Sequence, residues 1–271
     1  MADRSIDIGL KYYVRMTKSD YLHLGYWNPG EELTMENLRR AQERYIAHLI
    51  SFIPQGVRTV LDVGCGVGGN AIRLRKDGYA VEALSPDPSQ REMFIEKTRD
   101  EIPFHLTRFE DFEARTKYDL VLMSESVQYI KVREGFEKCR HCLKEGGFLL
   151  TADYYLRKPL PRENVMSESG HVEEEYLKAA REYGFRVVRS DDITPYVIPT
   201  LDLGRLVYDT YAKPTIELIH DVLKTRLPTL YKVGRFFVGR RIAGLFKYEQ
   251  LIDSGLFAQH KRYMIYLFQR S

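Results

Sequence analysis

The chain has 271 residues, of which 44% are hydrophobic and 29% are charged, and its formal net charge is +3. This composition excludes a disordered chain, and no apolar run reaches the roughly 18 residues that a membrane-spanning helix requires. Lys and Arg are spread along most of the sequence, so the charge gives no indication of nucleic-acid binding. Asp3 and Asp7 stand where a signal peptide has its basic and apolar regions, and we therefore expect a cytoplasmic protein.

The first predicted strand covers residues 60–63 and leads into a glycine-rich turn that opens a helix. Gly64, Gly66 and Gly69 fit the dinucleotide pattern G-x-G-x-x-G, in which the backbone approaches a pyrophosphate. Asp62 argues against a dinucleotide, because its carboxylate would repel a pyrophosphate but attract the ammonium of a methionine moiety. We therefore infer S-adenosylmethionine as the ligand. The alternative is a turn without a ligand, and so many glycines would weaken such a turn.

Helices and strands alternate after this turn, which predicts a doubly wound parallel sheet. The predicted helices cover residues 70–76, 88–99, 132–143 and 173–183, and the predicted strands cover 79–84, 104–106, 118–123, 148–152 and 185–188. Gly78, Gly146 and Gly184 each lie between a helix and the next strand, as expected of a left-handed helix end. Ligands of such sheets bind beyond the carboxyl ends of the strands, so the residues after each strand are candidates for the site.

Three short motifs resemble one enzyme family. The spacing Asp62-x-Gly64-x-Gly66-x-Gly68 resembles motif I of the class I S-adenosylmethionine-dependent methyltransferases, and the string 22–27, Leu-His-Leu-Gly-Tyr-Trp, is similar to that of tocopherol, sugar and polyketide methyltransferases. Ser85 and Gln90 resemble the branch that includes cyclopropane-fatty-acid synthases. The resemblance covers about residues 20–190. It implies an α/β fold with a mostly parallel, seven-stranded Rossmann-like sheet and an antiparallel last strand, and S-adenosyl-L-homocysteine as the product.

The resemblance places most cofactor contacts at strand ends. Ser85 occupies a corner where most relatives carry an acid for the ribose, and Arg108 stands where they carry an acid for adenine. Adenine is then read by the Phe109 backbone or by Glu110, unless Glu110 is a solvated surface acid. The predicted cofactor-binding residues are Asp62, Gly64, Cys65, Gly66, Gly68, Ser85, Gln90, Phe109, Glu110, Ser124, Tyr12 and Tyr21.

Residues 124–129 follow the fourth expected parallel strand and should lie beside the sulfonium. The Asn/Asp-Pro-Pro-Tyr tetrad of enzymes that methylate adenine or glutamine nitrogens is missing, which favours a small-molecule acceptor and no nucleic acid. Candidate catalytic residues are Glu125, His23 and Tyr129, with His171 as a further possible base. The alternatives are a segment that only caps the next helix and a hydrogen-bonded structural histidine.

Metal chemistry is not expected. Cys139 and Cys142 fall late in a predicted helix, where the helix dipole disfavours a thiolate, so we interpret them as helix-packing residues. Asp153 lacks the neighbouring Asp or Asn that metal-dependent relatives of the family use.

The last third of the chain does not continue the alternation of helices and strands. Helices are expected from about 199 to 256, and a final strand is expected at 262–268. We therefore divide the chain into an N-terminal helical lid (1–50), a cofactor-binding core (51–195 and 257–271) and a helical substrate cap (196–256). Aromatic and basic residues are interleaved in the cap, which predicts either a pocket for an apolar, anionic acceptor or an amphipathic helix with its basic face in water. The candidate substrate contacts are Trp27, Gln128, Tyr196, Tyr208 and Arg240.

The sequence thus predicts a methyltransferase that acts on a small molecule, such as a secondary metabolite, with oxygen, nitrogen or carbon as the accepting atom. One alternative is lipid methylation or cyclopropanation, for which the basic, aromatic cap would make peripheral contact with a membrane. Another is a cyclase-like protein that retains the cofactor without transferring its methyl group.

Overall fold

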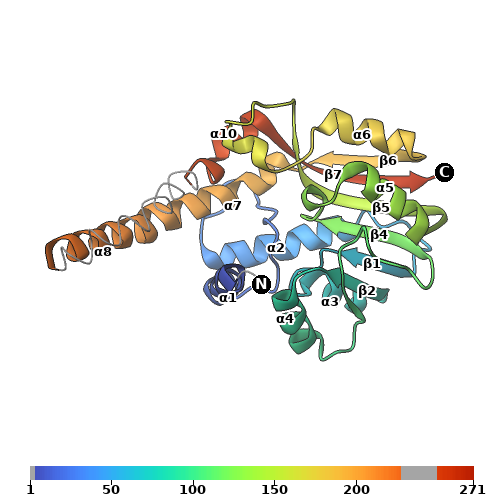
Figure 1. Ribbon diagram of the computed structural model, residues 1–271, viewed down its shortest axis with the longest axis horizontal. Coiled ribbons are helices and arrows are strands. Elements are labelled where there is room, and N and C mark those ends of the chain that lie inside the picture. The colour runs from blue at the N-terminus through green and yellow to red at the C-terminus, as the bar shows by residue number, and fades with distance from the viewer. Residues whose placement is uncertain (1–3, 227–248) are drawn as a thin grey trace.

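The computed structural model describes residues 4–226 and 249–271 of the chain. One sheet of seven strands has the order β3-β2-β1-β4-β5-β7-β6 (Figure 1). The strands are β1 (Thr59–Val63), β2 (Ala80–Ser85), β3 (Phe104–Leu106), β4 (Tyr118–Ser124), β5 (Leu143–Leu156), β6 (Phe185–Asp192) and β7 (Lys261–Arg270). Only β7 runs antiparallel to its neighbours β5 and β6. The predicted fold class and its antiparallel last strand are therefore confirmed.

Helices cover both faces of the sheet. Apolar side chains of α2, α3, α4, α7 and α10 form one core cluster on the first face, and those of α5 and α6 form a second cluster on the other face. The helices are α1 (Arg4–Thr17), α2 (Met35–Ile50), α3 (Gly69–Lys76), α4 (Pro88–Thr98), α5 (Val132–Cys142), α6 (Glu173–Glu182), α7 (Thr194–Val207), α8 (Lys213–Arg226) and α10 (Ser254–His260), with short turns η1 (Val127–Tyr129), η2 (Val165–Glu168) and η3 (Tyr208–Ala212).

Local chemistry explains where these elements begin and end. β4 is buried along nearly its whole length, as expected for a strand covered on both faces, and its sequence is almost continuously apolar. Asp87 caps α4 by accepting a hydrogen bond from the Ser89 amide, and Pro88 fits the first helical position. Cys139 and Cys142 are buried on α5 against the second core cluster, in agreement with their interpretation as packing residues.

β5 is longer than the sequence pattern predicts. Its expected span of 148–152 becomes Leu143–Leu156. Leu143 pairs with Tyr118 of β4 at one end, and at the other end β7 pairs with β5 as far as Leu156 while β4 ends opposite Ala152. The four residues 153–156 therefore extend past the end of β4 at the carboxyl edge of the sheet. This extension carries Asp153 and Tyr154 to the site described below.

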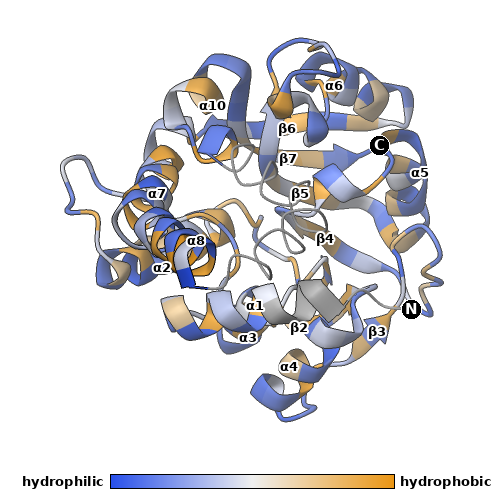
Figure 2. Ribbon diagram, turned by 60° about the vertical axis from the view of Figure 1, so that its left-hand side comes forward, coloured by the Kyte–Doolittle hydropathy of each residue, from blue (hydrophilic) through white to orange (hydrophobic). Residues whose placement is uncertain are grey.

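The helices that follow β6 project from the body of the domain. Figure 1 shows α8 continuing the direction of α7 away from the sheet, and Figure 2 shows both hydrophobic and hydrophilic residues along this arm. Leu218, Ile219 and Val222 on α8 are exposed apolar residues. No helix in the described ranges is long and apolar enough to cross a membrane. Arg240 lies outside the described residues.

Candidate active site

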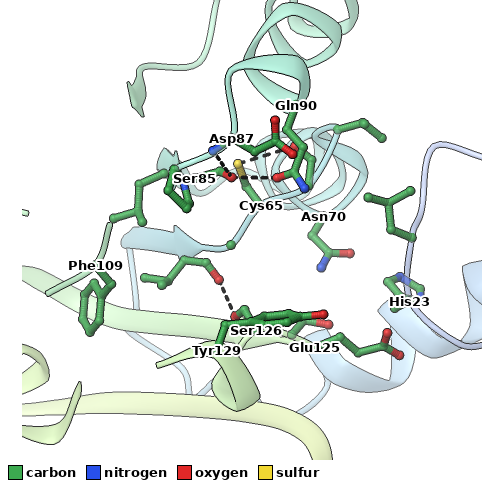
Figure 3. A pocket seen from close by; sticks show the side chains of 18 of the residues that line it. His23, Cys65, Asn70, Ser85, Asp87, Gln90, Phe109, Glu125, Ser126 and Tyr129 are labelled. Carbon is green, nitrogen blue, oxygen red and sulfur yellow. Dashed lines mark hydrogen bonds between the residues drawn. The ribbon is translucent and has the colours of Figure 1, made fainter. Parts of the chain in front are cut away.

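A cavity of about 420 Å³ opens at the carboxyl ends of β1, β2 and β4, where the sequence places the ligand (Figure 3). Its walls come from the glycine-rich turn, the ends of three strands and the segment between α1 and α2. This segment, residues 18–33, is the part of the expected N-terminal lid that reaches the cavity, and the word lid refers to it from here on. The predicted residues that line it are Tyr21, His23, Gly64, Cys65, Gly66, Ser85, Gln90, Phe109, Glu110, Ser124, Glu125, Gln128 and Tyr129. Asn70, Arg108 and Tyr154 also line it and were not assigned by the sequence.

The glycine-rich turn is tightly enclosed by the rest of the site. Gly64 has a φ of +75°, and a Cβ atom there would lie 2.4 Å from the Cβ of Ser126. Gly66 has a φ of +56°, and its Cβ would lie 3.0 Å from a methyl group of Leu22 in the lid. Both glycines are therefore required by backbone conformation and by close contacts within the protein, in addition to any contact with a ligand.

Asp62 lies within β1, beneath this turn. The residue is 1% exposed and does not line the cavity, and its Oδ2 atom has no hydrogen-bond partner. Burial raises the pKa of Asp62 to about 7. A buried carboxyl group without a compensating partner costs stability, so its presence beside the turn calls for a role outside folding.

A polar corner closes the end of β2. The Ser85 hydroxyl donates a hydrogen bond of 2.7 Å to Oε1 of Gln90, and the Asp87 amide donates to the same hydroxyl at 3.3 Å. Ser85 and Gln90 both face the cavity, where their remaining donor and acceptor atoms suit the hydroxyl groups of a ribose. The sequence-predicted pair is thus brought together by the structure.

The opposite wall is formed after β3. Phe109 is buried in the second core cluster while it also lines the cavity. Arg108, which stands where relatives carry an acid for adenine, donates a hydrogen bond of 3.4 Å to the carboxylate of Glu110, one of the two groups expected to read adenine. A flat, partly apolar wall of this kind suits a purine ring.

Glu125 lies at the other end of the cavity, directly after β4. Its backbone has a φ of +53°, a left-handed conformation that is unfavourable for a side-chain-bearing residue and is typical of functional sites. Its Oε1 atom accepts hydrogen bonds from the Leu24 amide at 2.7 Å and from the Tyr263 hydroxyl at 2.9 Å. Burial raises the pKa of Glu125 to about 7, although both hydrogen bonds oppose the shift. This carboxyl group can therefore hold or release a proton near neutral pH.

Asp153 fixes the loop that carries Gln128 and Tyr129. Its carboxylate accepts hydrogen bonds from the amides of Gln128 at 3.2 Å and Tyr154 at 2.8 Å. The Tyr154 hydroxyl donates to the side-chain oxygen of Gln128, while Tyr129 is 76% exposed at the cavity mouth. Burial and the charge of Glu125 raise the pKa of Asp153 to about 8. Asp153 does not itself line the cavity, so it acts on the site by positioning this loop.

The two candidate histidine bases are held in different ways. The His23 ring stacks on Tyr45 with centroids 4.1 Å apart, and its Nδ1–H donates to the Leu24 carbonyl oxygen at 2.8 Å. Burial lowers the pKa of His23 to about 4, so its ring is neutral at physiological pH. Nε2 of His171 donates to the carbonyl oxygens of Val127 and Ile130 at 3.0 and 2.9 Å, and His171 does not line the cavity.

Four further candidates lie away from the cavity. Tyr12 is 68% exposed on α1, and Tyr208 is on η3. Tyr196 stacks on Tyr26 with centroids 4.4 Å apart, and Trp27 is 1% exposed in a core cluster between α2 and α7. The cavity therefore gathers the residues that follow the strands, whereas these aromatic residues of the N-terminal segment and of the cap support the scaffold or face solvent. Gly68 in the turn and Asp62 in β1 do not line the cavity.

The buried carboxyl groups predict a stability that falls as the pH rises from 6.5 to 8. Asp62, Glu125 and Asp153 keep protons in the folded state that the unfolded chain releases near pH 4, because burial raises their pKa values to about 7, 7 and 8. His23 has the opposite shift, but its contribution is lost only below its unfolded pKa of about 6.5. Lys261, with its pKa lowered to about 8, offsets the trend only at the upper end of this window.

We expect the free energy of unfolding of the ligand-free protein to fall by about 2 kcal/mol across this window. Urea denaturation at pH 6.5, 7.25 and 8 measures the change. A constant or rising stability would show that these carboxyl groups are solvated and ionised in the folded protein.

The fold, the glycine-rich turn and the ligand-sized cavity at the strand ends together define a class of protein, the class I S-adenosylmethionine-dependent methyltransferases. The chain belongs to the methyltransferase domain family, whose model matches residues 38–190. It is 27% identical over 153 residues to the uncharacterised methyltransferase YodH of Bacillus subtilis, and 27% identical over 159 residues to the 2-methyl-6-phytyl-1,4-hydroquinone methyltransferase of Synechocystis. These matches cover 52% and 55% of this chain and 66% and 48% of the relatives.

A solved structure of a proposed sarcosine dimethylglycine methyltransferase from Galdieria sulphuraria has the same fold. The two structures align with a TM-score of 0.72 at 17% sequence identity, over 97% of this chain and 98% of the other. The resemblance that the sequence motifs indicate is thus confirmed at the level of family and fold.

Proposed function

We propose that this protein transfers a methyl group from S-adenosylmethionine to a small-molecule acceptor. The observation that carries the proposal is the division of the cavity into three parts, each suited to one part of that cofactor. The Ser85–Gln90 corner suits the ribose, the wall at Phe109 suits adenine, and the end with Glu125 suits the sulfonium and its methyl group. Asp62, buried and without a partner for Oδ2, adds a negative charge below the turn.

When bound, the cofactor supplies a methyl group activated by a sulfonium sulfur, and S-adenosylhomocysteine remains after transfer. The protein has to hold an acceptor atom in line with that methyl group, exclude water and, for a hydroxyl acceptor, take up a proton. The lid residues Leu22 and His23 cover one side of the cavity. Glu125 is placed to take the proton, and Gln128 and Tyr129 contact the acceptor at the mouth.

The size of the cavity, about 420 Å³, supports a small acceptor rather than a polymer. The lid is tied to Glu125 and to α7, where the Gly25 amide and the Trp27 ring N–H donate to the Thr200 hydroxyl at 2.9 and 2.8 Å. We propose that the helices after residue 195 form the acceptor-facing cap. A secondary metabolite with an apolar body fits this arrangement, and the accepting atom is oxygen, nitrogen or carbon.

A membrane-bound acceptor is a second candidate, favoured by the exposed apolar residues of α8. Leu218 and Ile219 are more than half exposed, and Lys224 and Arg226 follow in the last turn. Vesicles that contain an anionic lipid should then sediment the wild-type protein but not the variant Leu218→Ser/Ile219→Ser. Equal sedimentation of the two proteins would remove this candidate.

Asp62→Asn tests the cofactor assignment directly. The change keeps the shape of the side chain and removes a charge that acts on the cavity through the turn, so the affinity for S-adenosylmethionine should fall by about 1–2 kcal/mol, the size of a Coulomb interaction over several ångströms in a protein. Isothermal titration calorimetry at pH 8 measures the effect. Asp119→Asn is the matched control, because the Asp119 carboxylate accepts hydrogen bonds from the Arg58 and Thr59 amides at the opposite edge of the sheet. An unchanged affinity in Asp62→Asn would count against the proposed role of this carboxylate.

The acceptor can be sought with the protein loaded with cofactor. A metabolite extract should yield a product heavier by one methyl group, with one S-adenosylhomocysteine formed for each product molecule. Turnover of a substrate without S-adenosylhomocysteine would instead identify a cyclase-like protein that retains its cofactor.

A further inference from the structure

A chain of side-chain hydrogen bonds runs from the protein interior to the wall of the cavity. Nζ of Lys261, at the start of β7, donates to the Ser169 hydroxyl at 3.1 Å. The Ser169 hydroxyl is hydrogen-bonded to that of Tyr154, which donates to the side-chain oxygen of Gln128. Tyr154 and Gln128 line the cavity, whereas Lys261 is 2% exposed and, like Ser169, does not line it. The chain thus joins a buried cation to a residue of the cavity wall.

The surroundings of Lys261 fix both its charge and the tyrosine beside it. Its ammonium nitrogen lies 4.4 Å from the centroid of the Tyr154 ring, which is a cation–π contact. Burial lowers the pKa of Lys261 to about 8, although the charge of Asp153 opposes the shift, so the amine keeps its proton at neutral pH. Gly170 packs against the same ring, since a Cβ atom there would lie 3.2 Å from Cδ2 of Tyr154. Tyr154 is therefore held in one position.

The lysine sets the direction of the hydrogen bonds in this chain. An ammonium group only donates, so the Ser169 oxygen accepts from it and the Ser169 proton is given to the Tyr154 oxygen. Burial raises the pKa of Tyr154, and the hydrogen bond with Ser169 opposes this shift, as expected of a group that donates to the phenol oxygen. The Tyr154 proton is then given to Oε1 of Gln128.

The orientation of the Gln128 amide follows from this direction. With the amide turned over, its nitrogen would donate to Tyr154, Tyr154 would donate to Ser169, and the Ser169 proton would have no acceptor among the described residues. Oε1 is therefore the atom that faces Tyr154, and Nε2 makes no hydrogen bond with the described part of the chain. Because Gln128 lines the cavity, its two side-chain N–H bonds are available to a molecule bound there.

The surroundings favour a neutral oxygen as the partner of these N–H bonds. The ammonium group of Lys261 polarises the chain of hydrogen bonds and so strengthens its last donor. Glu125, three residues before Gln128, also lines the cavity, and its carboxylate would repel a second carboxylate. A carbonyl group accepts hydrogen bonds without carrying a charge, so it suits both neighbours.

We propose that the chain from Lys261 through Ser169 and Tyr154 orients the Gln128 amide as a hydrogen-bond donor to a neutral carbonyl oxygen of the methyl acceptor. The inference rests on the proposed function and refines it, because it names a chemical group of the substrate. Gln128 is then a specificity-determining residue, and the other three are positioning residues that act through it. A molecule of the same shape without the carbonyl group binds more weakly.

Matched pairs of phenols test this preference without knowledge of the natural acceptor. The meta and para isomers of hydroxyacetophenone each have an ethylphenol partner of similar shape, in which a methylene group replaces the carbonyl group. Titrations followed by NMR measure the affinity of each probe for the protein loaded with S-adenosylhomocysteine. The wild-type protein should bind at least one hydroxyacetophenone about five-fold more tightly than its partner, the effect of one net hydrogen bond.

Variants along the chain should reduce this preference while the ethylphenols bind as before. Gln128→Met keeps the length of the side chain without its N–H bonds and should abolish the preference. Tyr154→Phe and Lys261→Met leave the amide free to turn over, so the preference should fall to about two-fold. Lys261→Arg restores a charged donor and should recover part of it. Lys138→Met is the matched control, because Lys138 is also largely buried but donates to the Phe112 carbonyl oxygen away from the cavity.

The possible outcomes separate this inference from the proposed function. If Tyr154→Phe weakened both members of each pair equally, Tyr154 would have a purely structural role and the inference would be wrong. The absence of a preference in the wild-type protein, whether all probes bind equally or none binds, would also overturn it and leave the methyltransferase proposal intact. Failure to bind S-adenosylhomocysteine would overturn both. Should Lys261→Met fail to fold, Tyr154→Phe decides, and a preference as large as that of the wild type contradicts the proposal.

Discussion

Replacing Glu125 with glutamine should lower the rate of methyl transfer to a hydroxyl acceptor by about 10²- to 10⁴-fold, the range that a positioned general base supplies. The glutamine oxygen can still accept from the Leu24 amide and the Tyr263 hydroxyl, so the lid contact is kept and only the proton acceptor is lost. Because the pKa of Glu125 is about 7, the wild-type kcat/KM should rise with pH up to about 7 and then level off. The variant should lack this inflection. Steady-state kinetics with the acceptor from the metabolite screen measures both effects.

Tyr263→Phe is the companion variant for this test. The hydrogen bond from Tyr263 opposes the raised pKa of Glu125, so its removal should move the inflection to higher pH without abolishing transfer. A purely structural role for Glu125 predicts a different pattern. In that case Glu125→Gln would weaken the binding of S-adenosylhomocysteine while the pH profile kept its shape.

The parallel core of the fold follows from local sequence signals. β3 has the predicted bounds, and β4 and α5 differ from the prediction by one residue at one end. Strands covered on both faces are apolar throughout, and glycines or capping residues stop the helices between them, so each element is specified by its own residues. The length of β5 is a different case. Asp153 and Tyr154 extend that strand only because β7, more than one hundred residues later, pairs with them.

The residues of the candidate site also differ in how far local sequence specifies them. Gly64 and Ser85 directly follow predicted strands and Glu125 lies two residues after one, so the rule that ligands bind at carboxyl ends agrees with their position beside the cavity. Asn70 could have been found by the same rule, since it opens the helix after the glycine-rich turn. Tyr154, two residues after the predicted end of its strand, could have been found by the same rule, although its place within β5 depends on pairing with β7.

The lid shows why motif spacing alone does not assign roles. His23 and Trp27 belong to one short string, yet His23 faces the cavity and Trp27 packs against Leu38, Ala41 and Leu203. Which side chain turns inward depends on how α2 and α7 meet the lid, and these contacts are not encoded within the string. The protonation of His23 likewise depends on the Leu24 carbonyl and on burial, neither of which a sequence pattern reports.

The buried acids of the site indicate a compromise between stability and function. Asp62 and Glu125 are costly to ionise where they lie, and their raised pKa values express that cost. A cationic ligand beside them would favour their ionised forms, so cofactor binding should release protons near pH 7 and tighten as the pH rises. The same buried acids therefore have two effects as the pH rises to 8. They lower the stability of the ligand-free protein, and they raise its affinity for the cofactor.

Trp27→Ala should destabilise the ligand-free protein by about 3–5 kcal/mol, the usual cost of removing a large side chain from a core. Trp27 is almost fully buried, and its ring N–H donates to the Thr200 hydroxyl of α7, so the variant loses both its contacts and a buried hydrogen-bond donor. Urea denaturation followed by circular dichroism measures the loss. Tyr12→Ala is the matched control, because Tyr12 is exposed on α1 and its replacement should change stability by less than about 0.5 kcal/mol.

Trp27 also allows a direct test of where ligands bind. Trp27 is the single tryptophan of the chain, so intrinsic tryptophan fluorescence comes from the lid anchor alone. Since Trp27 does not line the cavity, S-adenosylhomocysteine should leave its emission maximum unchanged, although Tyr21 and His23 of the same segment line the cavity. Strong quenching by the cofactor or by an acceptor, together with a small loss of stability in Trp27→Ala, would place the indole ring in the binding site and contradict its role as an anchor between α2 and α7.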